Sequence, residues 1–136
     1  MENLNRQLLT NGFKFNDDLK IGTKKTLSEK IVQFGEGNFL RAFVDYMFDE
    51  INEQGLFEGG ITLIQPIPGG DFLRNVLNEQ EGLYTLIARG REDGKEVAAK
   101  RLITCVNRCI NPYVDLDTYN TCAKNPELRF VVSNTT

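Results

Sequence analysis

The spacing of apolar residues predicts a strand, a helix and a second strand in the first half of the chain. Residues 30–34 are short, contain β-branched side chains and stop at Gly35, as buried strands do. From residue 38 onward the apolar positions recur at helical spacing. They are Leu40, Phe43, Val44, Met47, Phe48 and Ile51, with Arg41, Asp45, Asp49 and Glu50 mostly on the other side. Residues 61–64 form the second apolar run.

These three elements have the length of a βαβ unit, about thirty-five residues in all, which is usual for a parallel crossover. Asn38 is predicted to be the N-cap of the helix, and Gln54-Gly55 its end. Such a crossover is right-handed almost without exception. The first half of the chain therefore predicts the start of a parallel sheet.

The second half of the chain changes character. Residues 83–89 and 96–106 are rich in β-forming side chains, and Asp93-Gly94 between them is typical of a hairpin turn. We therefore expect an antiparallel ribbon. The other expected elements are a short helix at 72–78, a helix at 114–124 with Asp115 or Asp117 near its start, a buried strand at 129–132 and an irregular arm at 1–29.

Together the elements predict an α/β fold: a Rossmann-type, mainly parallel sheet with an inserted antiparallel β-ribbon. In such sheets ligands bind just beyond the carboxyl ends of the strands. The chain stops directly after its last predicted strand, at residues 133–136, where such a binding loop would begin. We therefore expect a truncated domain that is part of a longer protein.

The turn after the first strand contains two glycines, Gly35 and Gly37, which match the first two of the dinucleotide fingerprint G-x-G-x-x-G. Leu40 stands in place of the third. The backbone N–H groups of Asn38, Phe39 and Leu40 would point at a phosphate, with Arg41 adding a positive charge. An ordinary turn between a strand and a helix is the alternative, and the βαβ context favours the nucleotide.

An acidic residue normally holds the ribose at the end of the second strand. The residue at that position is the neutral Gln65, and the nearest carboxylate is Asp71. Asp71 would either fold back to the ribose or cap the helix that begins at Phe72. The residues alone favour the cap.

Composition narrows the class of protein. The chain has 136 residues, a net charge of −3 and no histidine, which argues against a nucleic-acid surface and excludes Ser-His-Asp or Cys-His catalysis within it. No apolar run approaches the roughly 18 residues of a membrane span, and no signal peptide is recognisable, so we expect a cytoplasmic protein. Cys105, Cys109 and Cys122 are expected to be reduced thiols, and no metal site is expected.

Four stretches of the sequence resemble one enzyme family. They are IVQFGEGNFLRAFVDYMFDEIN, GLYTLIARG, RLITCVNR and NPELRFVVSNTT, in order from about residue 30 to the end. The chain resembles the mannitol dehydrogenase family of long-chain polyol dehydrogenases, in which a G-x-G-x-F-x-R-A turn is characteristic. Leu40 is then an expected residue at the third position.

The resemblance implies NAD as the cofactor. The glycine turn would cradle its pyrophosphate, the PGGD loop with Asp71 would hold the adenosine ribose and favour NAD over NADP, and the loop at the end of the last strand would touch the cofactor. Asn107-Arg108, at the end of the ribbon, would either approach the adenosine or be a plain strand terminus. The implied cofactor-binding residues are Gly35, Gly37, Asn38, Phe39, Leu40, Arg41, Asp71, Ser133, Asn134 and Thr135.

The resemblance also implies an activity. Residues 1–136 would be the partial N-terminal dinucleotide-binding domain of an oxidoreductase that reduces D-tagaturonate to D-altronate with NADH. The family's proton-transferring lysine lies in a C-terminal helical domain that would also bind the sugar acid, so no catalytic residue is expected in this chain, which alone would be inactive. The alternatives are another substrate of the family (fructuronate or mannitol), a stand-alone nucleotide-binding module, or a methyltransferase that uses S-adenosylmethionine. The oligomeric state stays open.

Overall fold

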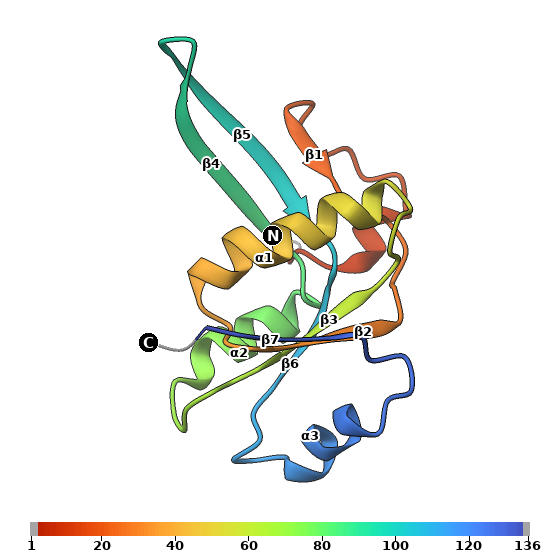
Figure 1. Ribbon diagram of the computed structural model, residues 1–136. Helices are drawn as coiled ribbons and strands as arrows, with labels where there is room; N and C mark the ends of the chain where they lie inside the picture. Colours follow the sequence, from red (N-terminus) through yellow and green to blue (C-terminus); the bar gives the residue numbers. More distant parts are fainter. Residues whose placement is uncertain (1–2, 135–136) are drawn as a thin grey trace.

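The computed structural model describes residues 3–134, which fold into two sheets with helices around them (Figure 1). The strands are β1 (Leu19–Ile21), β2 (Glu29–Phe34), β3 (Gly60–Ile64), β4 (Tyr84–Glu92), β5 (Lys95–Ile103), β6 (Val106–Ile110) and β7 (Phe130–Ser133). The helices are the 3-10 turn η1 (Arg6–Leu9), α1 (Asn38–Glu53), α2 (Asp71–Glu79) and α3 (Leu116–Ala123). The expected βαβ unit and the expected ribbon are both confirmed.

The larger sheet is parallel throughout, with the strand order β6-β3-β2-β7. Helices α1 and α2 cover one face and α3 covers the other (Figure 1). Because all four strands run the same way, their carboxyl ends meet at one edge of the sheet. The residues that follow the strands there are Gly35, Gln65, Asn111 and Asn134.

The smaller sheet contains the ribbon and, unexpectedly, the N-terminal segment. Strands β4 and β5 pair along nine residues each and project away from the body of the molecule (Figure 1). Strand β1 pairs in parallel with β5, so the prediction of an irregular arm at 1–29 is wrong. Leu9 is buried there against Leu83 and Leu102. Strand β1 is only three residues long, too short to show a periodic pattern in the sequence. Its pairing with β5 stabilises it instead.

Residues 107 and 108 lie in a strand of the parallel sheet and not at the end of the ribbon. The chain leaves the ribbon at Ile103 and enters β6, which pairs with β3. Asn107 donates to the carbonyl of Leu27 at 2.8 Å, and Arg108 forms a two-pronged ion pair with Glu29 at 2.8 and 2.9 Å. The prediction that these two residues end the ribbon is therefore wrong, because both lie in β6 and their side chains bind Leu27 O and the Glu29 carboxylate.

Helix α1 is oriented differently from its apolar pattern. Phe39, Phe43 and Met47 are 64, 53 and 41% exposed, whereas Asp45 and Asp49 are completely buried. Asp49 accepts hydrogen bonds from Arg101 Nε at 2.7 Å and from the backbone N–H groups of Thr104 and Cys105. These partners offset the desolvation of the carboxylate, so the side of the helix that carries Asp45 and Asp49 is buried. Of the apolar residues, only Leu40 is buried and Phe48 packs against the core.

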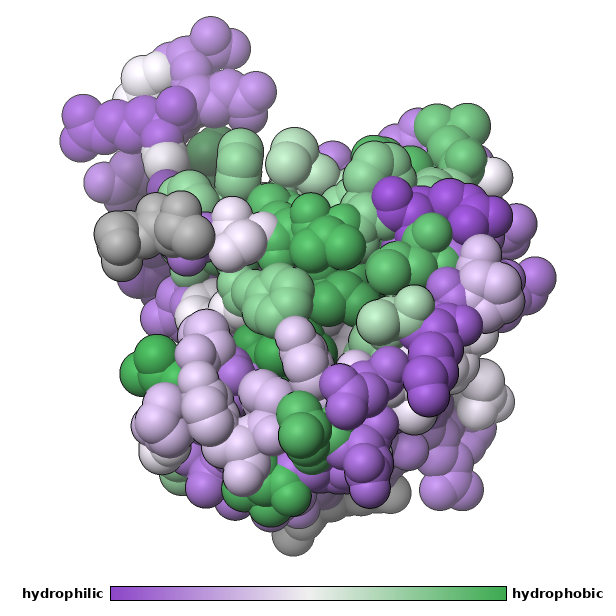
Figure 2. All heavy atoms as spheres, turned by 60° about the horizontal axis from the view of Figure 1, so that its bottom comes forward, coloured by the Kyte–Doolittle hydropathy of each residue, from purple (hydrophilic) through white to green (hydrophobic). Residues whose placement is uncertain are grey.

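Strand β7 is present as predicted but is an exposed edge strand and not a buried one. Phe130 and Val131 are 49 and 63% exposed. Figure 2 turns the α3 side of the molecule forward and shows apolar side chains gathered in the middle of this face. A hollow between α3 and the sheet is lined here by Val32, Phe34, Tyr119, Cys122, Leu128 and Val131, among others. Within residues 3–134, no helix combines the length and the apolar character that crossing a membrane requires.

Candidate functional site

The glycine turn lies at the carboxyl edge of the parallel sheet, where strands β2, β3 and β7 end. A shallow cavity of about 310 Å³ opens beside it. Its lining consists of Gly35, Glu36, Gly37, Phe39, Leu40, Pro66, Ile67 and Asn134. The turn between β2 and α1, the loop after β3 and the residue after β7 are therefore brought together in space.

The two glycines of the turn are there for different reasons. Gly35 has a φ of 125°, which side chains rarely allow, and its N–H donates to Ile64 O at 2.9 Å. Gly37 is the N-cap of α1, with an ordinary backbone (φ −70°, ψ 169°), and a Cβ atom added to it would meet nothing within 4 Å. The fold thus requires glycine at the first position but not at the second.

The first turn of α1 presents backbone donors to the cavity. Its leading N–H groups have no carbonyl one turn earlier in the helix to bind, and Gly37 supplies no side chain to cap them. Together with the helix dipole they favour an anion. The N-cap is Gly37 and Asn38 is the first helical residue, so the prediction that Asn38 is the N-cap is wrong and the helix begins one residue earlier than expected. Leu40 is buried and packs its Cδ1 beneath Gly35, so the third fingerprint position is a packing contact.

Arg41 folds back over the turn. Its Nε donates to Glu36 O at 2.8 Å and its Nη2 to Asn38 Oδ1 at 2.6 Å. The guanidinium also lies 4.9 Å from the centre of the Tyr84 ring. Two of its five N–H donors are therefore already used within the turn.

Two buried groups that the sequence did not single out lie behind Arg41. The Tyr84 hydroxyl oxygen lies 2.8 Å from Arg41 O and 3.0 Å from Asp45 Oδ2, and its one proton is donated to only one of these two acceptors at a time. Burial, followed by the nearby Asp45, raises the pKa of Tyr84 well above its usual value, so the hydroxyl keeps its proton. Burial also raises the pKa of Asp45 to about 7, against the hydrogen bond from Tyr84. The available signal was a tyrosine and an aspartate in otherwise apolar stretches, but nothing in the sequence pairs them.

Two fully buried glutamines support the loops around the cavity. Gln33 donates its amide to Gly35 O at 3.1 Å, and Gln65 donates to Ile67 O at 3.0 Å and also to Gly69 O. Gln65 stands where the ribose-binding acid was expected, and its side chain instead closes the loop after β3. Sequence reasoning missed Gln33, whose only signal was a polar residue near the end of an apolar strand.

Asp71 is the first residue of α2. The N-cap is Gly70, so the prediction that Asp71 caps a helix starting at Phe72 is wrong. Its carboxylate accepts from Asn111 Nδ2 at 2.8 Å and lies 3.5 Å from Arg74 Nη2. The side chain is 45% exposed and does not line the cavity beside the glycine turn.

The residues after β7 adjoin the glycine turn. Ser133 pairs with Phe34 in the sheet, which places the following Asn134 in the cavity wall. Thr135, the last of the implied cofactor-binding residues, lies outside the described residues. Ser133, Asn134 and the glycine turn are thus adjacent, while Asp71 does not line this cavity.

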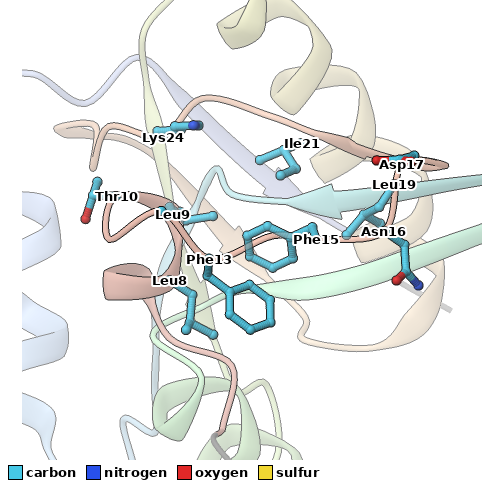
Figure 3. A pocket seen from close by; sticks show the side chains of 11 residues that line it. Leu8, Leu9, Thr10, Phe13, Phe15, Asn16, Asp17, Leu19, Ile21 and Lys24 are labelled. Atoms are coloured by element: carbon cyan, nitrogen blue, oxygen red, sulfur yellow. The ribbon is translucent and has the colours of Figure 1, made fainter.

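A larger hollow of about 540 Å³ lies between η1 and β1, away from the carboxyl edge of the parallel sheet (Figure 3). Leu8, Leu9, Phe13, Phe15, Leu19 and Ile21 form its apolar walls. Its two charged residues, Asp17 and Lys24, are exposed. It shares no residue with the cavity beside the glycine turn.

None of the three cysteines lines the cavity beside the glycine turn, and their thiols are poorly reactive. All three are buried and unpaired. Burial raises the pKa of Cys105 well above its usual value and that of Cys109 to about 12. Thiols in such surroundings are poor nucleophiles.

A parallel sheet with a central first strand, a glycine turn into a helix and an open carboxyl edge is one half of a Rossmann-type nucleotide-binding domain. The comparisons agree with this class. The family model described as the mannitol dehydrogenase Rossmann domain matches residues 29–135. The chain belongs to the mannitol dehydrogenase family.

Similar proteins carry related names. The altronate oxidoreductase of Klebsiella pneumoniae subsp. pneumoniae is 52% identical over 109 residues, which cover 79% of this chain and 22% of that protein. The altronate oxidoreductase of Bacillus subtilis is 44% identical over 108 residues, with the same coverage. The chain therefore spans about a fifth of the length of these relatives.

Solved structures show the same fold. The mannitol 2-dehydrogenase of Pseudomonas fluorescens, in a ternary complex with NAD and D-mannitol, superposes with a TM-score of 0.82 at 22% identity, covering 98% of this chain and 26% of that one. A D-sorbitol dehydrogenase in substrate-free form gives 0.81 at 18% identity, covering 98 and 27%. The expected fold and family are thereby confirmed.

Proposed function

We propose that residues 1–136 form the NAD-binding part of a tagaturonate reductase, also called altronate oxidoreductase, which reduces D-tagaturonate to D-altronate with NADH. Membership of the mannitol dehydrogenase family, the similarity to altronate oxidoreductases and the NAD complex of the Pseudomonas fluorescens neighbour support this proposal. When bound, NADH supplies the hydride. This chain supplies the surface that binds and orients it.

The strongest support for the proposal comes from Gly37, a glycine that the fold does not require. Its backbone conformation suits any residue, there is room for a side chain, and serine would cap the helix better. A glycine at a position of this kind is explained when another molecule approaches the backbone closely. The pyrophosphate of a dinucleotide, bound to the free N–H groups of α1, is such a molecule.

The other residues take roles according to their positions. Gly35 shapes the turn, Asn38, Phe39 and Leu40 offer N–H groups, and Arg41 holds the turn in shape. Asn134, the residue after β7, lines the same cavity, and Ser133 precedes it at the end of β7. Thr135 lies outside the described residues, and its contact with the cofactor is proposed from the family resemblance alone. Asp71 would reach the adenosine ribose by rearrangement of the loop after β3, which contains two left-handed glycines. The proton-transferring lysine and the sugar-acid site belong to a C-terminal helical domain of the longer protein.

The test is a titration of this chain with NADH, followed by the emission of the nicotinamide because the chain has no tryptophan. Gly37→Ser is expected to abolish binding while raising the free energy of unfolding by a few tenths of a kcal/mol through better capping. Gly90→Ser is the matched control, because Gly90 lies in the ribbon with nothing within 4 Å of an added Cβ. Equal affinity of all three proteins, or no binding by the folded parent chain, would refute the proposal.

The preference for NAD is tested by a parallel titration with NADPH. The carboxylate of Asp71 would accept hydrogen bonds from the ribose hydroxyls and repel a 2′-phosphate. Asp71→Ala is therefore expected to weaken NADH binding roughly tenfold, the effect of losing one charge-assisted hydrogen bond, and to leave NADPH binding unchanged or stronger. Equal losses of affinity for NADH and NADPH would show that Asp71 does not bind the ribose.

A second substrate class is favoured by one observation. The Pseudomonas fluorescens neighbour was solved with D-mannitol, so a polyol is the alternative to the sugar acid. Oxidation of D-altronate compared with D-mannitol, measured on the longer protein with NAD, decides between them.

A further inference from the structure

The ribbon reaches the glycine turn through one residue. Tyr84 is the first residue of β4, is 8% exposed and is anchored opposite Ile103 of β5. Its hydroxyl bonds the carbonyl of Arg41, which is 43 residues earlier in the chain. The other oxygen beside the hydroxyl, Asp45 Oδ2 at 3.0 Å, lies one helical turn further along α1. Tyr84 thus fixes the beginning of α1 from the outside.

Tyr84 also holds Arg41 by its side chain. The aromatic ring lies under the guanidinium at 4.9 Å, an arrangement in which the ring attracts the cation. The same guanidinium binds the carbonyl of Glu36, the residue between the two glycines. The contacts therefore run from the ribbon through Arg41 to the middle of the turn.

Gly35 is held by Ile64 O and by the Gln33 amide, whereas the second half of the turn, Glu36 and Gly37, has fewer bonds to the sheet. Glycine has the largest backbone freedom of all residues, and Gly37 makes no capping bond with a side chain. A turn that had to be ordered when a ligand arrives would lose affinity through conformational entropy. An external brace removes that cost.

We propose that Tyr84 is a positioning residue of the dinucleotide site: by holding the carbonyl and the guanidinium of Arg41, it fixes the glycine turn in the shape that receives the pyrophosphate. This inference rests on the proposed function. It gives the inserted ribbon a role in cofactor affinity, although no part of the ribbon lines the cavity.

The experiment compares the parent chain with Tyr84→Phe and Tyr46→Phe. Tyr84→Phe keeps the ring under Arg41 and removes the hydroxyl. Tyr46→Phe is the matched control, because its hydroxyl also bonds a carboxylate of α1, Glu50 at 2.7 Å, but does not contact the turn. A second variant, Arg41→Lys, keeps the positive charge and loses the fork that reaches Glu36 O.

Two quantities are measured at a temperature where circular dichroism shows all four proteins folded. The first is the dissociation constant for NADH. The second is amide hydrogen exchange, residue by residue, which needs no ligand. A merely structural role of Tyr84 would speed exchange throughout the sheet, whereas the proposed role speeds it at residues 36–41 alone.

We expect Tyr84→Phe and Arg41→Lys each to weaken NADH binding roughly fivefold, the factor of one ordinary hydrogen bond, with faster exchange confined to the turn. Tyr46→Phe should stay within about twofold of the parent. Unchanged affinity and exchange in Tyr84→Phe would overturn the inference and leave the proposed function standing. If the parent chain binds no NADH, the proposed function fails. In that case, exchange in Tyr84→Phe that is faster throughout the sheet, and not at residues 36–41 alone, would refute the positioning role of Tyr84 as well.

Discussion

Asp45 is a buried carboxyl group whose protonation changes near neutral pH. Its neighbours with charge or a titratable proton are Tyr84, Arg41, Asp49 and Cys105. Burial raises the pKa of Asp45 from 3.8 to about 7. Between these two values the folded chain holds a proton that the unfolded chain has released. The resulting stabilisation is present at acidic pH and is lost as the pH rises through about 7.

Asp45→Asn should therefore remove a pH dependence and not merely shift stability. The free energy of unfolding of the parent chain is expected to fall, relative to that of the variant, by up to about 1.4 kcal/mol per pH unit between about pH 5 and pH 7. Asparagine has nearly the same shape and still accepts from the Tyr84 hydroxyl. Urea unfolding at several pH values measures the difference, and parallel curves for the two proteins would show that Asp45 does not titrate in this range.

At the scale of elements, helix α1 shows that an apolar stripe does not by itself identify the buried face. Its apolar and polar residues both recur at helical spacing, so either side could face the sheet. The choice is made by Arg101 and by the N–H groups at the junction of β5 and β6, which are 52 to 56 residues away from Asp49 in sequence.

This orientation predicts an unusual ranking of two substitutions. Asp49→Ala leaves the buried Arg101 Nε and two backbone N–H groups without their acceptor, while Glu53 still pairs with Arg101 Nη2 at 2.8 Å, and the substitution is expected to cost roughly 3 kcal/mol. Phe43→Ala removes a much larger apolar group but one that is half exposed, and is expected to cost less than about 1 kcal/mol. Chemical denaturation of both variants gives the ranking, and a larger loss for Phe43→Ala would mean that the apolar side of α1 is the buried one.

At the scale of the whole molecule, the N-terminal segment joins the two sheets. The family match begins at residue 29, yet the segment before it contributes β1 and part of a buried cluster. Arg6 is its main anchor. Its Nη2 donates to Thr104 O at 3.0 Å and Val106 O at 2.8 Å, the two carbonyls between which the chain passes from ribbon to parallel sheet.

Arg6→Ala is therefore expected to lower the free energy of unfolding by about 2 kcal/mol, since two part-buried carbonyls lose their donor. Lys14→Ala, which removes an exposed cation from the same segment, serves as the control and should change stability by less than about 0.5 kcal/mol. Thermal or urea unfolding measures both. A loss from Arg6→Ala no larger than that from Lys14→Ala would show that the N-terminal segment is not part of the cooperative fold.

The sequence by itself determined the elements whose signals are local. The apolar runs of β2 and β3, the helical spacing of α1 and the Asp93-Gly94 hairpin all depend on neighbouring residues, and each was found where expected. The glycine turn also lies within one continuous stretch, the first of the four that carry the family resemblance. For these features, hydrophobic periodicity and turn chemistry are sufficient.

Only the tertiary structure decided the features that depend on a distant partner. Strand β1 forms because it pairs with the edge of β5. Strand β6 belongs to the parallel sheet and not to the ribbon because it pairs with β3. The same is true of the buried side of α1, of the contacts of Arg41 with Tyr84 and of the hydrogen bond that Asp71 accepts from Asn111. Each is a balance between the cost of burying a polar group and a partner that is far away in the chain, and no local pattern contains that partner.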